Sequence, residues 1–269
     1  MVKKDVVLYE KRGKTGIVTL NTPEIMNAYD FEGLDVLRKV LEDAVDDPEV
    51  WTLILTGAGE KAFCAGLNLK KADTDYAAGR IPWGPTHGFR VHERMRILSH
   101  FGYIEKPVVA AINGYCIGGG LELAMGCDIL IAAEHATFEI AEIKRGNLPG
   151  ITPAKLGRYI PYNLAMELML TGRRIDAKEA YRIGLINKVV PLAKLMPTAL
   201  AVADEINESA PLSVRAAKEV AWKQMMSLTT SEALELCTRF LHGPILASED
   251  SREGMRAFVE KRKPVWKAR

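Results

Sequence analysis

The residues Gly118-Gly119-Gly120-Leu121-Glu122 could form an anion-binding turn with a carboxylate beside it. They follow the strand-like run 108–112 at a short distance and lead into a helix-like run. Glycines let a backbone approach a ligand closely, and a helix start offers N–H groups without intrahelical partners. A carboxylate next to an oxyanion site favours proton transfer at a carbon beside a carbonyl. The same glycines could instead serve only a tight turn, with Glu122 complementing the helix dipole.

A second glycine-containing segment, Gly57-Ala58-Gly59-Glu60-Lys61-Ala62, has the spacing G-x-G-x-x-A after another strand-like run. This spacing occurs in dinucleotide-binding turns, where it opens a crossover helix. The residues that follow, Phe63-Cys64-Ala65-Gly66, are not typical of a helix start, so the dinucleotide interpretation is weak. The segment could instead supply another exposed N–H group. Lys61 and Lys70 could pair with a phosphate, although a single lysine is more often simply solvated.

A second carboxylate, Glu142, lies between an apolar stretch and a turn that contains Gly146 and Gly150. Taken alone, this position is typical of a surface residue or of one that flanks a helix. Thr152 is predicted as the N-cap of a following helix with Pro153 at its first position, because proline is favoured there. The local pattern therefore leaves the role of Glu142 open.

The elements that must position these residues have an α/β pattern. Strand-like runs recur at 16–21, 50–56, 108–112 and 129–133, with helical patterns between them. Apolar residues from Phe31 to Ala44 recur at three- and four-residue spacing, which predicts a helix with one face toward a core. Asp30 is its expected N-cap. The alternation of short strands and helices is typical of α/β proteins.

Two regions depart from this alternation. The segment 73–85 combines glycines and prolines with Tyr76 and Trp83, and predicts a long loop that is either functional or an ordered part of the surface. After Pro191 the strand patterns end. Helices are expected at 200–206, 212–226 and 231–241, which predicts a helical C-terminal segment after the α/β core.

Composition excludes several function classes. The 269 residues carry a formal net charge of +2, which favours neither nucleic acid nor an acidic membrane as a partner. No run approaches the ~18 apolar residues of a membrane span, and no leader is evident, so we expect a soluble cytoplasmic protein. The histidines and the four cysteines lack metal-ligand spacing, so no metal is expected. The basic C-terminal tail, residues 261–269, is predicted to be solvated.

The motifs taken together resemble the enoyl-CoA hydratase/isomerase superfamily, which has the crotonase fold. The resemblance is carried, in chain order, by Asn21-Thr22-Pro23-Glu24 with Asn27-Ala28, by Lys61-Ala62-Phe63-Cys64-Ala65-Gly66, by Asn113-Gly114-Tyr115 with the 118–122 segment, by Glu142-Ile143 with Gly146-Asn147-Leu148-Pro149-Gly150, and by Arg252-Glu253-Gly254-Met255. It implies an α/β protein with a crotonase-type ββα spiral core, residues 1–195, followed by a helical C-terminal trimerisation segment, residues 196–269. The order of these motifs excludes the dinucleotide interpretation.

The resemblance also implies roles for single residues. In the family the thioester carbonyl of an acyl-CoA accepts two backbone N–H bonds, and the matching donors are Leu67 and Gly119. Hydratases of the family carry two glutamates, matching Glu122 and Glu142, which hold a water over C3 and handle its proton and the C2 proton. Gly150 matches a glycine whose backbone helps to position that water. Two enclosed carboxylates should have separated pKa values, but the sequence does not assign acid and base.

Coenzyme A would bind through residues at both ends of the chain. Lys61, Ala65 and Lys70 match positions that contact it, whereas Phe258 and Lys261 match residues that reach it from a neighbouring subunit. The resemblance therefore implies a homo-oligomer, either a trimer or a dimer of trimers. No separate cofactor is implied, because coenzyme A is part of the substrate.

The acyl group is less well defined. Ile151-Thr152-Pro153-Ala154 replaces the glycine-rich turn of many hydratases, and the segment 260–267 resembles carnitinyl-CoA dehydratases. The leading prediction is an enoyl-CoA hydratase that adds water to a 2-enoyl-CoA through a stabilised enolate. The alternatives are an isomerase, a hydrolase of thioester or C–C bonds, and a non-enzymatic RNA-binding relative. The presence of both glutamates favours hydration over isomerisation.

Overall fold

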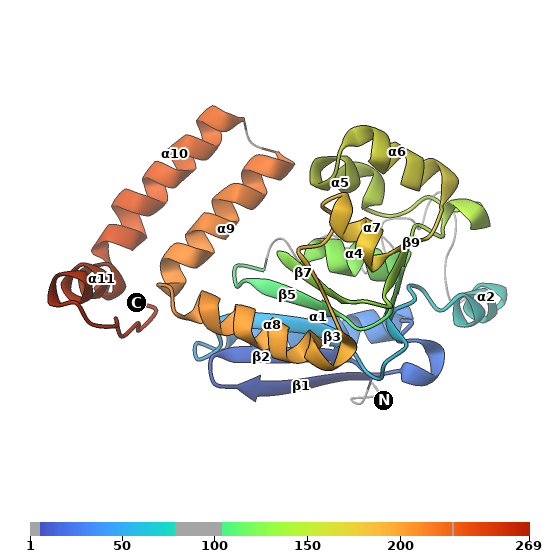
Figure 1. The fold of residues 1–269 in the computed structure, drawn as a ribbon, viewed down its shortest axis with the longest axis horizontal. Helices are drawn as coiled ribbons and strands as arrows, with labels where there is room; N and C mark the ends of the chain where they lie inside the picture. Colours follow the sequence, from blue (N-terminus) through green and yellow to red (C-terminus); the bar gives the residue numbers. More distant parts are fainter. Residues whose placement is uncertain (1–5, 79–103, 228) are drawn as a thin grey trace.

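The computed structural model describes residues 6–78, 104–227 and 229–269 (Figure 1). Its strands are β1 Val7–Arg12, β2 Thr15–Leu20, β3 Thr52–Gly57, β4 Ala62–Cys64, β5 Val108–Ile112, β6 Tyr115–Ile117, β7 Ile129–Ala133, β8 Thr137–Glu139, β9 Ile175–Asp176 and β10 Lys188–Val190. Its α-helices are α1 Phe31–Asp46, α2 Leu69–Ala77, α4 Gly119–Gly126, α5 Thr152–Tyr159, α6 Tyr162–Thr171, α7 Ala177–Arg182, α8 Leu192–Asn207, α9 Pro211–Met226, α10 Thr230–Phe240 and α11 Glu249–Glu260.

The strands form two sheets, and successive units of the chain contribute one strand to each. The larger sheet has the order β1-β2-β3-β5-β7-β10, with β1 antiparallel to β2 and the other pairs parallel. The smaller sheet has the order β4-β6-β8-β9. The series β3-β4-α2 and β5-β6-α4 therefore repeats as a ββα spiral. This confirms the fold class that the sequence predicts.

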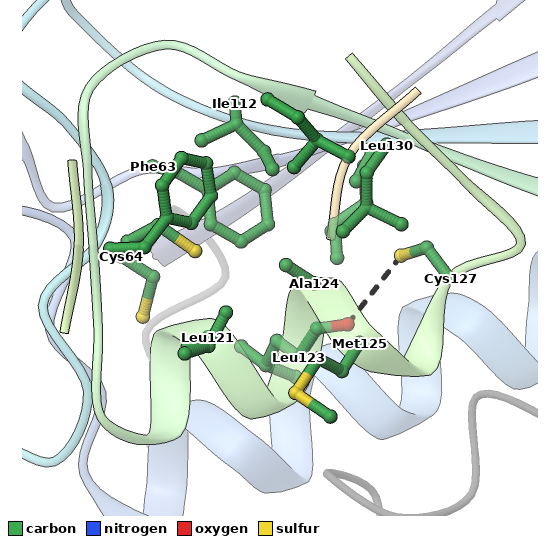
Figure 2. Packing of buried hydrophobic residues seen from close by; sticks show 14 of the residues in the cluster. Phe63, Cys64, Ile112, Leu121, Leu123, Ala124, Met125, Cys127 and Leu130 are labelled. Carbon is green, nitrogen blue, oxygen red and sulfur yellow. Dashed lines mark hydrogen bonds between the residues drawn. The ribbon is translucent and has the colours of Figure 1, made fainter. Parts of the chain in front are cut away.

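The core lies on both faces of the larger sheet. In β3, Leu53 and Leu55 pack in one apolar cluster with α1, whereas Ile54 packs in a second cluster with α8. This alternation follows from the two-residue period of a strand. Asp30 caps α1 as expected, because its carboxylate accepts a hydrogen bond from the Gly33 N–H. Figure 2 shows Phe63, Ile112 and Leu130 among the apolar side chains packed with α4.

The prediction of a long loop at 73–85 is wrong over its first part, because α2 extends through Ala77. The Asn68 carboxamide accepts from the Lys71 N–H at the start of this helix, and Lys71 pairs with Asp75 one turn later. These local bonds favour a helix. A loop was predicted from the sequence instead, because glycines and prolines follow in residues 79–85. Residues 79–85, including Trp83, lie outside the described residues, as does the side chain of Tyr76.

The C-terminal part is helical, as predicted, and no strand follows β10 in the described part of the chain. The predicted boundary at 195/196 falls inside α8, which packs against β3, β5 and β7. In Figure 1, α9 and α10 form a hairpin beside the sheets, and α11 lies at its open end, where α10 finishes. Among the described residues, no helix is both long enough and apolar enough to span a membrane.

The basic side chains of residues 261–269 are exposed, as predicted, but the backbone of this tail is bound to the rest of the chain. The buried Asp250 carboxylate accepts from the backbone N–H groups of Lys267 and Ala268. The Trp266 indole donates to the Glu208 carbonyl, and Arg262 pairs with Glu253. Asp250 and Glu253 of α11 therefore hold the tail against this helix. The number of basic residues in the tail did not predict these contacts.

Candidate active site

The two glycine segments lie side by side, because the short strands that lead into them are paired. β4 is parallel to β6, and each strand ends at a loop with a left-handed glycine, Gly66 at φ +84° and Gly118 at φ +56°. A Cβ atom on Gly66 would lie 3.1 Å from the Gly119 nitrogen. Within the described residues, no acceptor takes the N–H of Leu67 or of Gly119. The structure therefore brings two free donors together.

Glu122 is buried in the first turn of α4 and is held by the start of another helix. Its Oε1 accepts hydrogen bonds from the Ile151 N–H at 2.6 Å, the Thr152 N–H at 3.1 Å and the Thr152 hydroxyl at 3.2 Å. Ile151 is the N-cap of α5 and Thr152 its first residue. The prediction of Thr152 as the N-cap is thus wrong. A carboxylate from α4 satisfies the N–H groups instead, as the positive end of a helix favours.

Glu142 lies on the other side of the 118–122 turn, directly before the short helix η4, Ile143–Arg145. Its Oε1 is 2.7 Å from the position that a Cβ on Gly118 would take. Its Oε2 is buried and has no hydrogen-bond partner in the described part of the protein. Burial raises the pKa of the Glu142 carboxyl, and the negative charge of Glu122 raises it further.

Gly150 completes this group of residues. A Cβ on Gly150 would lie 3.1 Å from Oε2 of Glu122, the oxygen opposite the one held by α5. The site residues named from the sequence in this region, Leu67, Gly119, Glu122, Glu142 and Gly150, therefore surround one turn. Such an arrangement can stabilise a developing oxyanion and move protons on either side of it.

The residues expected at coenzyme A fall into two groups. Lys61 and Ala65 flank β4, and Lys70 lies in the first turn of α2, so all three are close in sequence to the loop at Leu67. Both lysines are exposed. By contrast, α11 and α2 lie at opposite ends of the molecule in Figure 1. Phe258 in α11 and Lys261 at its C-cap are exposed and are not brought to the site within one chain.

Sequence reasoning missed two features of the site. The first is the pair of backbone donors, Ile151 and Thr152, that hold Glu122. Their only signal was the unusual Ile151-Thr152-Pro153 sequence, which marks a helix start next to Gly150. The second is Tyr29, whose hydroxyl is buried against Gly119. Its position directly after Asn27-Ala28 gave no chemical signal, because an aromatic residue beside an amphipathic helix is typical of a core.

Comparisons with known proteins match the chain over nearly its whole length. A sequence model of the enoyl-CoA hydratase/isomerase family matches residues 10–269. The chain is 38% identical over 259 residues to a short-chain-enoyl-CoA hydratase of Clostridium acetobutylicum, covering 96% of this chain and 95% of that protein. It is 37% identical over 270 residues to a carnitinyl-CoA dehydratase of Proteus mirabilis, covering 96% and 97%. The crystal structure of an enoyl-CoA hydratase from Bacillus anthracis superposes with a TM-score of 0.89, at 32% identity over 98% of this chain and 100% of that chain.

Proposed function

The chain belongs to the enoyl-CoA hydratase/isomerase family, and we propose that it acts as an enoyl-CoA hydratase, a hydro-lyase of the cytoplasm. It would add water in the syn sense to a 2-enoyl-CoA and release a 3-hydroxyacyl-CoA. The observation that carries this proposal is the pair of carboxylates around one turn, of which one is held by a helix start and the other has a raised pKa. Hydration needs both a proton acceptor and a proton donor.

The first requirement is a site for the thioester oxygen. The free N–H groups of Leu67 and Gly119 would donate to this oxygen as negative charge develops on it. Since these donors belong to loops fixed by the pairing of β4 and β6, they need no rearrangement during the reaction. A single preorganised donor of this kind is typically worth ~3–4 kcal/mol of transition-state stabilisation.

The second requirement is a base for the attacking water. Three hydrogen bonds hold Oε1 of Glu122 and leave its Oε2 facing Gly150. The Gly150 backbone would position a water there. The water proton passes to Glu122 while the water oxygen forms its bond to C3, and the π electrons move to the thioester oxygen as an enolate.

The third requirement is an acid for C2. Burial favours the protonated form of Glu142, so this residue would give its proton to C2 as the enolate collapses. Transfer of the remaining proton from Glu122 to Glu142 then restores the enzyme. The structure thus supports a division of roles that the sequence left open, with Glu122 as base and Glu142 as acid.

Coenzyme A would be held by residues of two subunits. Lys61, Ala65 and Lys70 lie near the oxyanion loops of their own chain, and the flexible lysines would act on phosphates as point charges. Phe258 and Lys261 would come from a neighbour in a trimer or a dimer of trimers. No further cofactor enters this mechanism, because the protein residues and water supply every proton.

The test is the fate of a short trans-2-enoyl-CoA in heavy-oxygen water. We expect a 3-hydroxyacyl-CoA that carries the heavy oxygen, and loss of that product by ~10²–10⁴-fold in Glu122→Gln and in Glu142→Gln. A 3-enoyl-CoA without heavy oxygen would assign the protein to the isomerases. A free acid would indicate a hydrolase, and binding of RNA without any turnover would indicate a non-enzymatic relative.

A further inference from the structure

Tyr29 is attached to the first oxyanion loop by its backbone. Its N–H donates to the Gly66 carbonyl at 2.9 Å, and its carbonyl accepts from the Asn68 N–H at 2.8 Å. These two bonds form a parallel bridge to Leu67, the residue between them. The position of Tyr29 is therefore fixed relative to the Leu67 N–H.

The side chain of Tyr29 reaches the second oxyanion loop. A Cβ atom on Gly119 would lie only 1.8 Å from the Tyr29 hydroxyl oxygen, so the phenol fits because residue 119 has no side chain. Gly119 also supplies the other free N–H. The backbone of Tyr29 thus touches one predicted donor, and its hydroxyl lies against the residue that provides the other.

The hydroxyl of Tyr29 is buried without a partner. The residue is 7% exposed, and no group in the described part of the chain forms a hydrogen bond with its oxygen. Buried hydroxyls in proteins are nearly always hydrogen-bonded, so an unpaired one beside reacting groups indicates a missing ligand. Burial raises the pKa of Tyr29 well above its usual range, and the charges of Glu122 and Glu142 act in the same direction. The phenol therefore keeps its proton and can donate it in a hydrogen bond.

We propose that the Tyr29 hydroxyl is a third hydrogen-bond donor to the substrate thioester oxygen, beside the N–H groups of Leu67 and Gly119. This inference rests on the proposed function, because it assumes an acyl thioester at the oxyanion loops. A donor of this kind strengthens its bond as the carbonyl oxygen gains charge, so its contribution falls on the transition state more than on the bound substrate. Removal of the hydroxyl should lower kcat by about 100-fold and change KM little.

The direct test measures the carbonyl bond of a bound, unreactive ligand. A saturated acyl-CoA with an isotope-labelled thioester carbonyl is bound to wild-type protein and to Tyr29→Phe, and its infrared C=O stretch is recorded. The loss of a donor should raise the stretching frequency in the variant. Tyr159→Phe is the matched control, because the hydroxyl of the partly buried Tyr159 donates to the Met125 carbonyl instead. The C=O frequency of the ligand bound to this variant should equal that in wild type.

A second variant covers the case in which phenylalanine disturbs the fold. Incorporation of 3-fluorotyrosine at position 29 keeps the shape and makes the phenol a stronger donor, so the C=O frequency should fall below that of wild type. Equal frequencies in wild-type, Tyr29→Phe and fluorotyrosine proteins would overturn the proposal and leave Tyr29 as a packing residue. Because the ligand is saturated, this result does not depend on hydration. A protein that shows the frequency shifts but produces no 3-hydroxyacyl-CoA would support the Tyr29 inference and refute the hydratase assignment.

Discussion

At the scale of single residues, the site is built from two glutamates with different surroundings. Glu122 satisfies the first N–H groups of α5, so its charge is balanced by the helix that it caps. Among the described residues, none forms a hydrogen bond with Oε2 of Glu142, and burial opposes the ionisation of this carboxyl. The two glutamates therefore differ in their hydrogen-bond partners, and these differ because each lies at the end of a different helix.

Replacement of Glu142 by glutamine should lower the activity but raise the thermal stability. The pKa of Glu142 in the folded state is raised above its ordinary value of 4.5. Ionisation of Glu142 therefore lowers the stability of the fold as the pH rises from 4.5 through the folded-state pKa. Glu142→Gln should therefore lose ~10²–10⁴-fold in hydration rate and unfold at a higher temperature than wild type at pH 7. The gain in melting temperature should shrink as the pH falls toward 4.5. Thermal unfolding over this pH range measures it, with the exposed Glu24→Gln as control; a gain independent of pH would contradict the raised pKa.

The Thr152 hydroxyl should help to hold the Glu122 carboxylate in place, because it donates to Oε1. Thr152→Val keeps the backbone N–H and the side-chain shape but removes one of the three donors to Oε1. Hydrogen bonds to charged groups are worth ~1.5–3 kcal/mol, so we expect a loss of about tenfold or more in kcat/KM. Thr238→Val, which removes a hydroxyl from the exposed face of α10, should leave steady-state kinetics unchanged. Wild-type kinetics in Thr152→Val would show that the two backbone donors suffice.

At the scale of elements, the buried five-residue strands were predicted best from the sequence. β5 and β7 have the bounds expected from their apolar runs, since both faces of these strands are covered. The three-residue strands β4, β6 and β8 were not predicted, because a repeat of two residues cannot be recognised over so short a length. Yet β4 and β6 are the strands that align the oxyanion loops.

The site could be predicted only in part for a related reason. Gly119 and Glu122 have a local signature, a glycine run before a helix, whereas Glu142 was assigned through the family resemblance. Tyr29 and Ile151 act through contacts with residues far away in the chain. Such contacts depend on how the two sheets and α5 are packed, and no local pattern encodes them.

The start of α1 offers a test of an element by itself. Asp30→Ala removes the carboxylate that accepts from the Gly33 N–H and should cost ~1 kcal/mol of unfolding free energy. Asp46→Ala is the matched control at the other end of the helix. A carboxylate there faces the negative end of the dipole, so its removal should be neutral or slightly stabilising. Urea unfolding of both variants measures the difference, and equal free energies would show that the cap bond contributes nothing.

At the scale of the whole molecule, the residues predicted to bind coenzyme A lie in two separate regions of the chain. Lys61 precedes β4 and Lys70 lies in α2, so both are close in sequence to the loop at Leu67. By contrast, α11 and α2 lie at opposite ends of the molecule in Figure 1. Phe258 is 85% exposed, which leaves a large aromatic side chain in water in a single chain. An oligomer in which α11 packs near the site of a neighbour would cover this ring and complete the site.

Single substitutions test this arrangement better than truncation after Gly254, because α11 runs from Glu249 to Glu260 and a truncation would cut it. Phe258→Ser should weaken assembly, measured by sedimentation. Lys261→Ala should weaken acyl-CoA binding several-fold but leave the binding of an acyl-pantetheine without phosphates unchanged. The Lys263→Ala control removes a side chain that is 91% exposed and should bind like wild type.

Mixed oligomers decide whether Lys261 acts between chains. Glu142→Gln chains lack the acid, so this protein alone should be inactive. Lys261→Ala chains lack the lysine, so this protein alone should have a raised KM. In an oligomer assembled from both, a Lys261→Ala chain provides an intact Glu142 and its Glu142→Gln neighbour provides an intact Lys261. If the lysine crosses the interface, some sites are complete, and the mixture should gain turnover with the KM of wild type. If each lysine serves its own chain, no site is complete, and the mixture should show only the raised KM of the Lys261→Ala protein.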